Sequence, residues 1–103
     1  MKISQEEFIK NRHIAIRIED ASLLEPILKW CDINNIKYSE NDIRRFKRCL
    51  KEENMVLFSL YNKNEVDFYT VIINQIVYNI DDIDFLIPNT IWIGINQPMM
   101  WII

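Results

Sequence analysis

Apolar and polar side chains alternate over residues 13–19, where Ile14, Ile16 and Ile18 fall on one face. A period of two is typical of a half-buried β-strand. Residues 91–95 alternate in the same way, and residues 99–103 can add an edge strand at the end of the chain. The pattern therefore predicts β-structure near both ends of the sequence.

Two further segments, 55–61 and 66–73, are rich in β-branched and aromatic residues. The polar residues 62–65 between them predict a hairpin. Asn74-Gln75 predicts a second two-residue turn, which leads into a strand at 76–80. Together these segments predict consecutive antiparallel strands.

Three segments carry helix signals. Ser4 with Glu7, and Ser39 with Asp42, have the spacing of a capping box, so helices are predicted over 5–10 and about 41–53. Residues 22–34 place apolar side chains on one side of a helix, and its start is expected after Asp20 because Pro26 is tolerated only in a first turn. Asn34-Asn35 can adopt the left-handed conformation that ends this helix. The fold predicted for residues 1–103 is a single α+β domain, with an antiparallel sheet of about five strands and two main helices on one face.

Composition excludes several classes of protein. Half of the 103 residues are hydrophobic, which excludes a disordered chain, and a single glycine argues against phosphate-binding loops. The N-terminus lacks the apolar run of a signal peptide, and prolines and amides interrupt the uncharged C-terminal stretch, so neither export nor membrane insertion is expected. We expect a cytoplasmic protein without contact to a membrane.

Candidate catalytic and metal-binding residues form no recognisable motif. His13 is the single histidine, and with Cys31 and Cys49 it cannot complete a four-ligand zinc site, so both cysteines are expected to be buried reduced thiols. The acidic residues of 81–84 lack the spacing and glycine of a calcium loop. Glu65 and Asp67 share a strand face without the lysine that a metal-dependent nuclease would use. No enzyme activity, cofactor or metal is therefore expected.

The net charge of −3 conceals an asymmetry along the chain. Residues 1–51 carry 11 basic and 8 acidic side chains, whereas residues 52–103 carry Lys63 and seven acids. Five cations lie on the polar side of the helix predicted at 41–53: Arg44, Arg45, Lys47, Arg48 and Lys51. This surface can bind an acidic protein or nucleic acid, or it can be a solvated helix face.

The last nineteen residues, 85–103, carry no charged side chain and include Trp92 and Trp101. Tryptophan and methionine are enriched in protein interfaces, where charge is depleted. The segment is therefore expected to bind a partner or to form a homodimer through Trp92 and Trp101, with ordinary packing into the core as the alternative.

The order of helices and strands over residues 5–73 resembles the winged-helix family of nucleic-acid-binding domains. SENDIRRFKRCLKEEN would be its recognition helix and MVLFSLYNKNEVDFYTVII its wing, which implies a DNA-binding transcriptional regulator.

The segment IAIRIEDASLLEPILKWCDINNIKYSE, followed by hairpins ending in NIDDIDF, is similar to small phage-encoded accessory proteins of the β-α-β-β type. This resemblance implies a non-enzymatic inhibitor of the anti-CRISPR kind, which occludes a defence protein, such as a nuclease, in the cytoplasm of a bacterial host. A third possibility is a toxin-neutralising immunity protein that uses the acidic C-terminal half.

Overall fold

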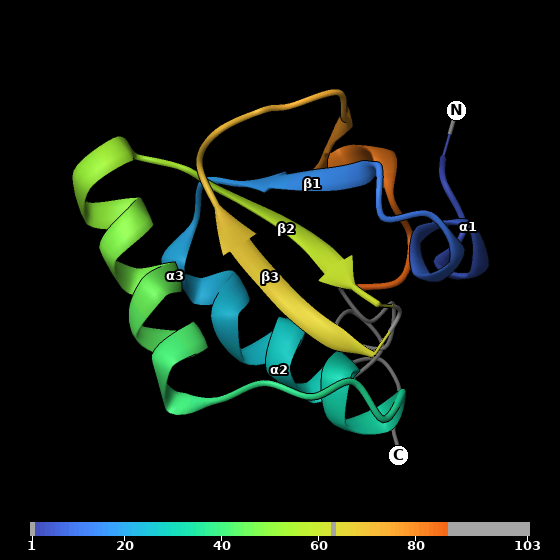
Figure 1. Ribbon diagram of the computed structural model, residues 1–103, viewed down its shortest axis with the longest axis horizontal. Coiled ribbons are helices and arrows are strands. Elements are labelled where there is room, and N and C mark those ends of the chain that lie inside the picture. The colour runs from blue at the N-terminus through green and yellow to red at the C-terminus, as the bar shows by residue number, and fades with distance from the viewer. Residues whose placement is uncertain (1, 63, 87–103) are drawn as a thin grey trace, which may run out of the picture.

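Residues 2–62 and 64–86 are described by a computed structural model, and they form one α+β domain around a single core (Figure 1). In chain order the elements are α1 (Gln5–Lys10), β1 (Ile14–Ile18), η1 (Ala21–Leu23), α2 (Leu24–Ile33), α3 (Glu40–Glu53), β2 (Val56–Tyr61), β3 (Glu65–Tyr69), β4 (Ile76–Asn79) and η2 (Ile80–Asp82). The predicted α+β class is confirmed. The strands predicted at 91–95 and 99–103 lie outside the described residues.

The sheet is mixed, and the prediction of an antiparallel sheet is wrong in this respect. Its four strands in the described residues have the order β3-β2-β1-β4. The pairs β1–β2 and β2–β3 are antiparallel, whereas β4 runs parallel to β1, with Ile16 opposite Tyr78. The last strand therefore pairs with the first one, at the opposite edge from β3.

The predicted hairpin turn at Asn74-Gln75 is replaced by a crossover, residues 70–75, which connects β3 to β4. Leu57 is opposite Tyr69, so β3 could lengthen by one residue, with Thr70 opposite Val56, before it passed the start of β2. Beyond Val56 little chain is left for pairing, because Asn54 caps the C-terminus of α3 two residues earlier. The chain leaves the sheet after Tyr69, although its next residues are β-branched.

The helix ends follow the predicted local chemistry. Both capping boxes form, at Ser4 before α1 and at Ser39 before α3. Pro26 lies in the first turn of α2, where its missing N–H has no partner to lose. After α2, Asn35 has a φ of 58°. Asparagine tolerates this left-handed conformation better than most residues, so the chain can turn there.

The α-helices of the described residues pack on one face of the sheet, and this confirms the predicted placement of the two main helices. The rings of Phe58 and Phe68 lie side by side on adjacent strands, with centroids 5.5 Å apart. Trp30 of α2 meets Phe58 edge-on at 6.1 Å, and Phe46 of α3 meets Phe68 at 5.1 Å. Phe8 of α1 lies 5.2 Å from Phe58. This aromatic cluster is the centre of the core.

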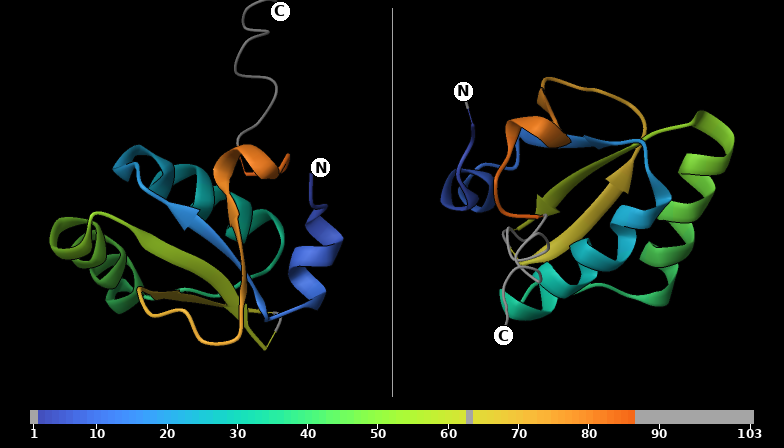
Figure 2. Two further views of the ribbon diagram at one scale, coloured as in Figure 1. Left: turned by 90° about the horizontal axis from the view of Figure 1, so that it is seen from above. Right: turned by 180° about the vertical axis from the view of Figure 1, so that it is seen from behind.

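The second face of the sheet is partly covered by the crossover. The strand neighbours of Leu57 point towards the helices, so Leu57 itself points to the second face. Its side chain nevertheless has no exposed surface. The side chain of Gln75 donates a hydrogen bond to the Tyr69 hydroxyl, which donates to the Ser59 hydroxyl at 3.0 Å. In the left panel of Figure 2 the crossover lies on the side of β1 away from α2. None of the helices in residues 2–62 and 64–86 is long and apolar enough to cross a membrane.

Candidate interaction surface on α3

Helical spacing places four cations of α3 side by side. At 3.6 residues per turn, Lys47, Lys51, Arg44 and Arg48 fall within an arc of about 100° around the helix axis. All four are exposed, and Phe46 on the opposite side of the helix is fully buried in the core. We call these four residues the basic stripe.

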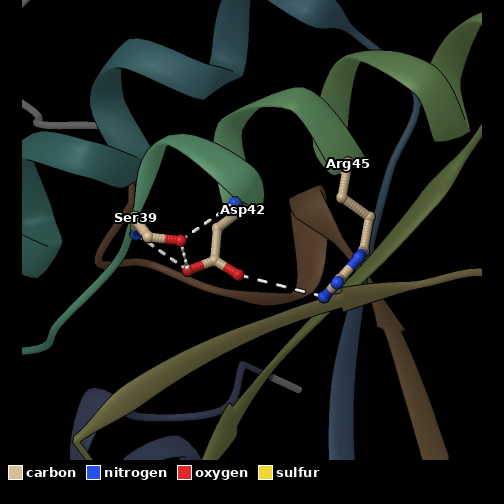
Figure 3. A network of polar contacts seen from close by, with 3 residues as sticks. All are labelled: Ser39, Asp42 and Arg45. Atoms are coloured by element: carbon tan, nitrogen blue, oxygen red, sulfur yellow. Dashed lines mark hydrogen bonds and ion pairs between the residues drawn. The ribbon is translucent and has the colours of Figure 1, made fainter.

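The fifth predicted cation, Arg45, points towards the sheet. Its guanidinium lies 3.9 Å from the carboxylate of Asp42, and Figure 3 shows the side chain extending from the helix towards the strands. The same carboxylate accepts a hydrogen bond from the backbone N–H of Ser39 at 2.8 Å. Arg45 therefore belongs to the polar network at the start of α3, and its side chain is still 44% exposed beside the basic stripe.

The four cations of the basic stripe take part in no ion pair within the described part of the chain. Arg44 donates a hydrogen bond to the side chain of Asn41 at 3.1 Å. The ion pairs found in the described residues include none with Lys47, Arg48 or Lys51. Like charges four residues apart destabilise a helix by about 0.2–0.5 kcal/mol per pair. The stripe therefore costs the helix a little stability unless solvent or a partner screens its charges.

An acidic pocket of about 500 Å³ lies beside α3, at the β3 edge of the sheet. Its carboxylates come from Asp42, Glu65 and Asp67, and Tyr38 and Tyr61 contribute aromatic rings. Burial raises the pKa of Asp67, and this is opposed by Arg45 and reinforced by Asp42. The sequence suggested the acidic strand face but not its contact with α3, since β3 meets the helix only in the tertiary structure.

On its other side, the basic stripe borders an apolar groove between α2 and α3. Leu24 and Leu28 of α2 and Ile43 of α3 line the groove, together with Lys47 from the basic stripe, and its volume is about 550 Å³. The three apolar side chains are only half-buried. The i, i+4 spacing of Leu24 and Leu28 is visible in the sequence, but the facing of the two helices is not. The groove places apolar surface between Lys47 of the basic stripe and Glu25 of α2.

Among the described residues, the remaining candidates are His13, Cys31 and Cys49. His13 is exposed at the start of β1. Cys31 and Cys49 are free and buried, as predicted, and burial raises the pKa of Cys31 to about 12. Within residues 2–62 and 64–86 no three His, Cys, Asp or Glu side chains form a metal-binding group. Trp92 and Trp101 lie outside the described residues, so the structure does not test their predicted role.

Comparisons with protein-family models, with curated proteins and with solved structures find no match to this chain.

Proposed function

We propose that this chain is a non-enzymatic binding protein that uses the basic stripe of α3 to bind the acidic surface of another protein. The observation that carries the proposal is the cluster of four exposed cations, none of which forms an ion pair within the described residues. Arginine and lysine in this arrangement bind carboxylates or phosphates. A partner would supply the negative charge that the fold does not.

The surroundings of the stripe favour protein over nucleic acid. The groove on one side offers Leu24, Leu28 and Ile43 to an apolar ridge of a partner. The pocket on the other side offers Glu65 and Asp67, which would repel a DNA phosphate backbone. Protein interfaces combine apolar surface with charged residues at the rim, and this combination is present on the α2 side of the stripe.

The biological role that we propose is inhibition by occlusion, in which the chain covers a functional surface of a bacterial defence protein such as a nuclease. Electrostatic steering by the stripe would speed encounter with an acidic target. Such an inhibitor needs no catalytic group, because its effect comes from the area that it covers.

The proposal is tested by two charge-matched variants. The double variant Arg48→Glu/Lys51→Glu reverses half of the basic stripe. The control, Lys10→Glu/Arg12→Glu, changes two exposed cations at the end of α1 and the turn after it, and therefore changes the net charge equally. Each immobilised protein is exposed to a bacterial lysate, and the captured proteins are quantified by mass spectrometry. Melting temperatures are measured in parallel.

We expect the wild type and the control to retain the same acidic proteins, and the stripe variant to lose them at an unchanged melting temperature. Equal capture by all three chains would refute a role for the stripe. The winged-helix alternative is tested with a labelled DNA duplex at increasing salt. Tight binding that weakens steeply with salt and disappears in the stripe variant would make DNA the partner.

A further inference from the structure

The apolar groove lies between two helices that are anchored to the sheet separately. Trp30 of α2 packs against Phe58 of β2, and Phe46 of α3 packs against β3. The helices cover the same face of the sheet but point in different directions (Figure 1). Within the described part of the chain their backbones approach each other at few places. Their facing side chains therefore line an open groove of about 550 Å³ instead of a closed helix interface.

The walls of the groove have the spacing of a helix ridge. Leu24 and Leu28 lie four residues apart on α2. Ile43 and Lys47 lie four residues apart on α3. Each pair is separated by about 6 Å along its helix axis, at 1.5 Å per residue. A row of side chains at i, i+4 on a third helix has the same spacing and packs between such rows. The shape of the groove therefore favours a helical ligand with apolar side chains four residues apart.

The two rims of the groove differ in charge. On the α2 rim, Glu25 forms an ion pair with Lys29 at 3.5 Å, so these two charges cancel. On the α3 rim, Lys47 lines the groove. Lys47 and Lys51 lie about 40° and 80° from Ile43 around the helix axis, so they are the cations of the basic stripe nearest the groove. A complementary ligand therefore carries its acidic side chains on the flank that faces α3.

The acidic pocket directs an acidic ligand to the groove. Its carboxylates, from Asp42, Glu65 and Asp67, lie on the β3 side of α3. They repel negative charge that approaches the basic stripe from that side. The groove lies on the opposite side of the stripe, where Lys47 is the cation in its lining. An acidic ligand is therefore attracted to the stripe from the groove side.

We propose that the groove binds an amphipathic acidic helix of the partner protein. The apolar ridge of this helix lies between Leu28 and Ile43, and its carboxylates contact Lys47 and Lys51. Helix-in-groove recognition reads apolar anchors along one face of the ligand. Because the acids lie on one flank only, the helix fits in one of its two directions along the groove. The inference rests on the proposed function, since it specifies the acidic partner of the stripe.

The test uses three synthetic peptides of about 20 residues, long enough to form a helix. The acidic peptide carries two leucines four residues apart and glutamates along one flank, in a background of alanine and glutamine. The basic peptide has lysines in place of the glutamates. The scrambled peptide has the acidic composition with its leucines on opposite sides of the helix. Binding to the full chain is measured by fluorescence anisotropy, and backbone amide NMR shifts show where each peptide binds.

Three variants examine the two halves of the contact. Leu28→Gln removes the apolar wall on α2, and Ile43→Gln removes the opposite wall should Leu28→Gln fail to fold. The matched control Ile33→Gln changes an isoleucine of the same helix that is 79% exposed and lies outside the groove lining. Lys47→Glu reverses the charge at the rim.

We expect the acidic peptide to shift the amides of residues 21–28 and 43–47, and to bind about tenfold more tightly than the other two peptides. Leu28→Gln should weaken binding about tenfold, the loss expected when a leucine side chain is no longer buried by the ligand. Ile33→Gln should bind as the wild type does. Lys47→Glu should reduce the preference for the acidic over the basic peptide about fivefold, the size of an exposed ion pair.

Several results would overturn the proposal. They are an acidic peptide that does not bind, a scrambled or basic peptide that binds equally well, and amide shifts outside the groove. Groove shifts that depend on protein concentration without peptide would identify a second copy as the occupant. Contacts from residues 87–103 to Leu28 would identify the end of the same chain as the occupant. Either finding would also overturn it.

Lysate capture separates this inference from the proposed function. Acidic proteins that are lost from the stripe variant but retained by Leu28→Gln would leave the proposed function standing and overturn the groove as its docking site. Equal capture by the stripe variant and the wild type would instead refute the proposed function.

Discussion

The Leu57 side chain lies on the face of the sheet that the helices leave uncovered, yet it has no exposed surface. Its strand neighbours Val56 and Phe58 belong to the helix-covered core, so Leu57 points the other way. The crossover, residues 70–75, is the segment that approaches this face, through the hydrogen bond from Gln75 to Tyr69. The substitution Leu57→Ala therefore measures how tightly the crossover closes the second face.

The size of the effect follows from the burial. Leu57→Ala removes three carbon atoms from a fully buried site, and the transfer contribution is about 0.8 kcal/mol for each. The cavity left behind adds to this loss, and buried Leu→Ala substitutions cost about 2–5 kcal/mol in total. The short crossover can collapse partly into the space, so we expect a loss of about 2–3 kcal/mol, at the lower end of that range. For a domain of this size the melting temperature falls by roughly 4–8 °C per kcal/mol.

Urea denaturation measures the loss as a shift in the midpoint at an unchanged slope. The control is Ile33→Ala, because the Ile33 side chain is 79% exposed and its removal should change stability by less than about 0.5 kcal/mol. A loss below about 1 kcal/mol for Leu57→Ala would refute the reasoning, since it is well under the range for a buried leucine. It would mean that the second face is open to water and that the crossover does not cover it.

Two further predictions concern charge and capping around α3. Burial raises the pKa of Asp67 in the folded protein above its unfolded value, so its ionisation at neutral pH costs stability. Asp67→Asn should therefore raise the melting temperature at neutral pH, and its advantage should shrink as the pH falls through the raised pKa. A less stable variant at neutral pH would show that attraction to Arg45 outweighs burial. Ser39→Ala removes the capping box shared with Asp42 and should cost about 1 kcal/mol in urea denaturation. No measurable loss would contradict the capping geometry.

The basic stripe was predictable from sequence, because helical spacing alone decides which side chains share a face. The tertiary structure added what lies beside the stripe, namely the apolar groove against α2 and the acidic pocket against β3. Arg45 differs from the four residues of the stripe because it contacts Asp42 on the same helix and lies near enough to Asp67 of β3 to lower the pKa of that carboxyl. The groove against α2 and the pocket against β3 depend on how elements distant in sequence pack together.

The local structure of the chain was determined by the sequence through short-range physics. Each of these local features involves residues that are only a few positions apart. They are the capping boxes at Ser4 and Ser39, the alternation at Ile14–Ile18 and the left-handed conformation of Asn35. Hydrogen bonds and sterics over that distance do not depend on the rest of the fold.

The position of β4 was decided by the tertiary structure. Asn74, with a φ of 52°, permits a tight turn, and the sequence around it matches a hairpin as well as a crossover. Alternation reports which face of a strand is buried but not which strand lies beside it. β2 begins soon after α3 and offers β3 at most one further partner, Val56, and β4 pairs instead with β1 in parallel. Strand pairing joins residues that are far apart in the sequence. The pairing of β4 therefore depended on the edge of β1 that the tertiary structure left available.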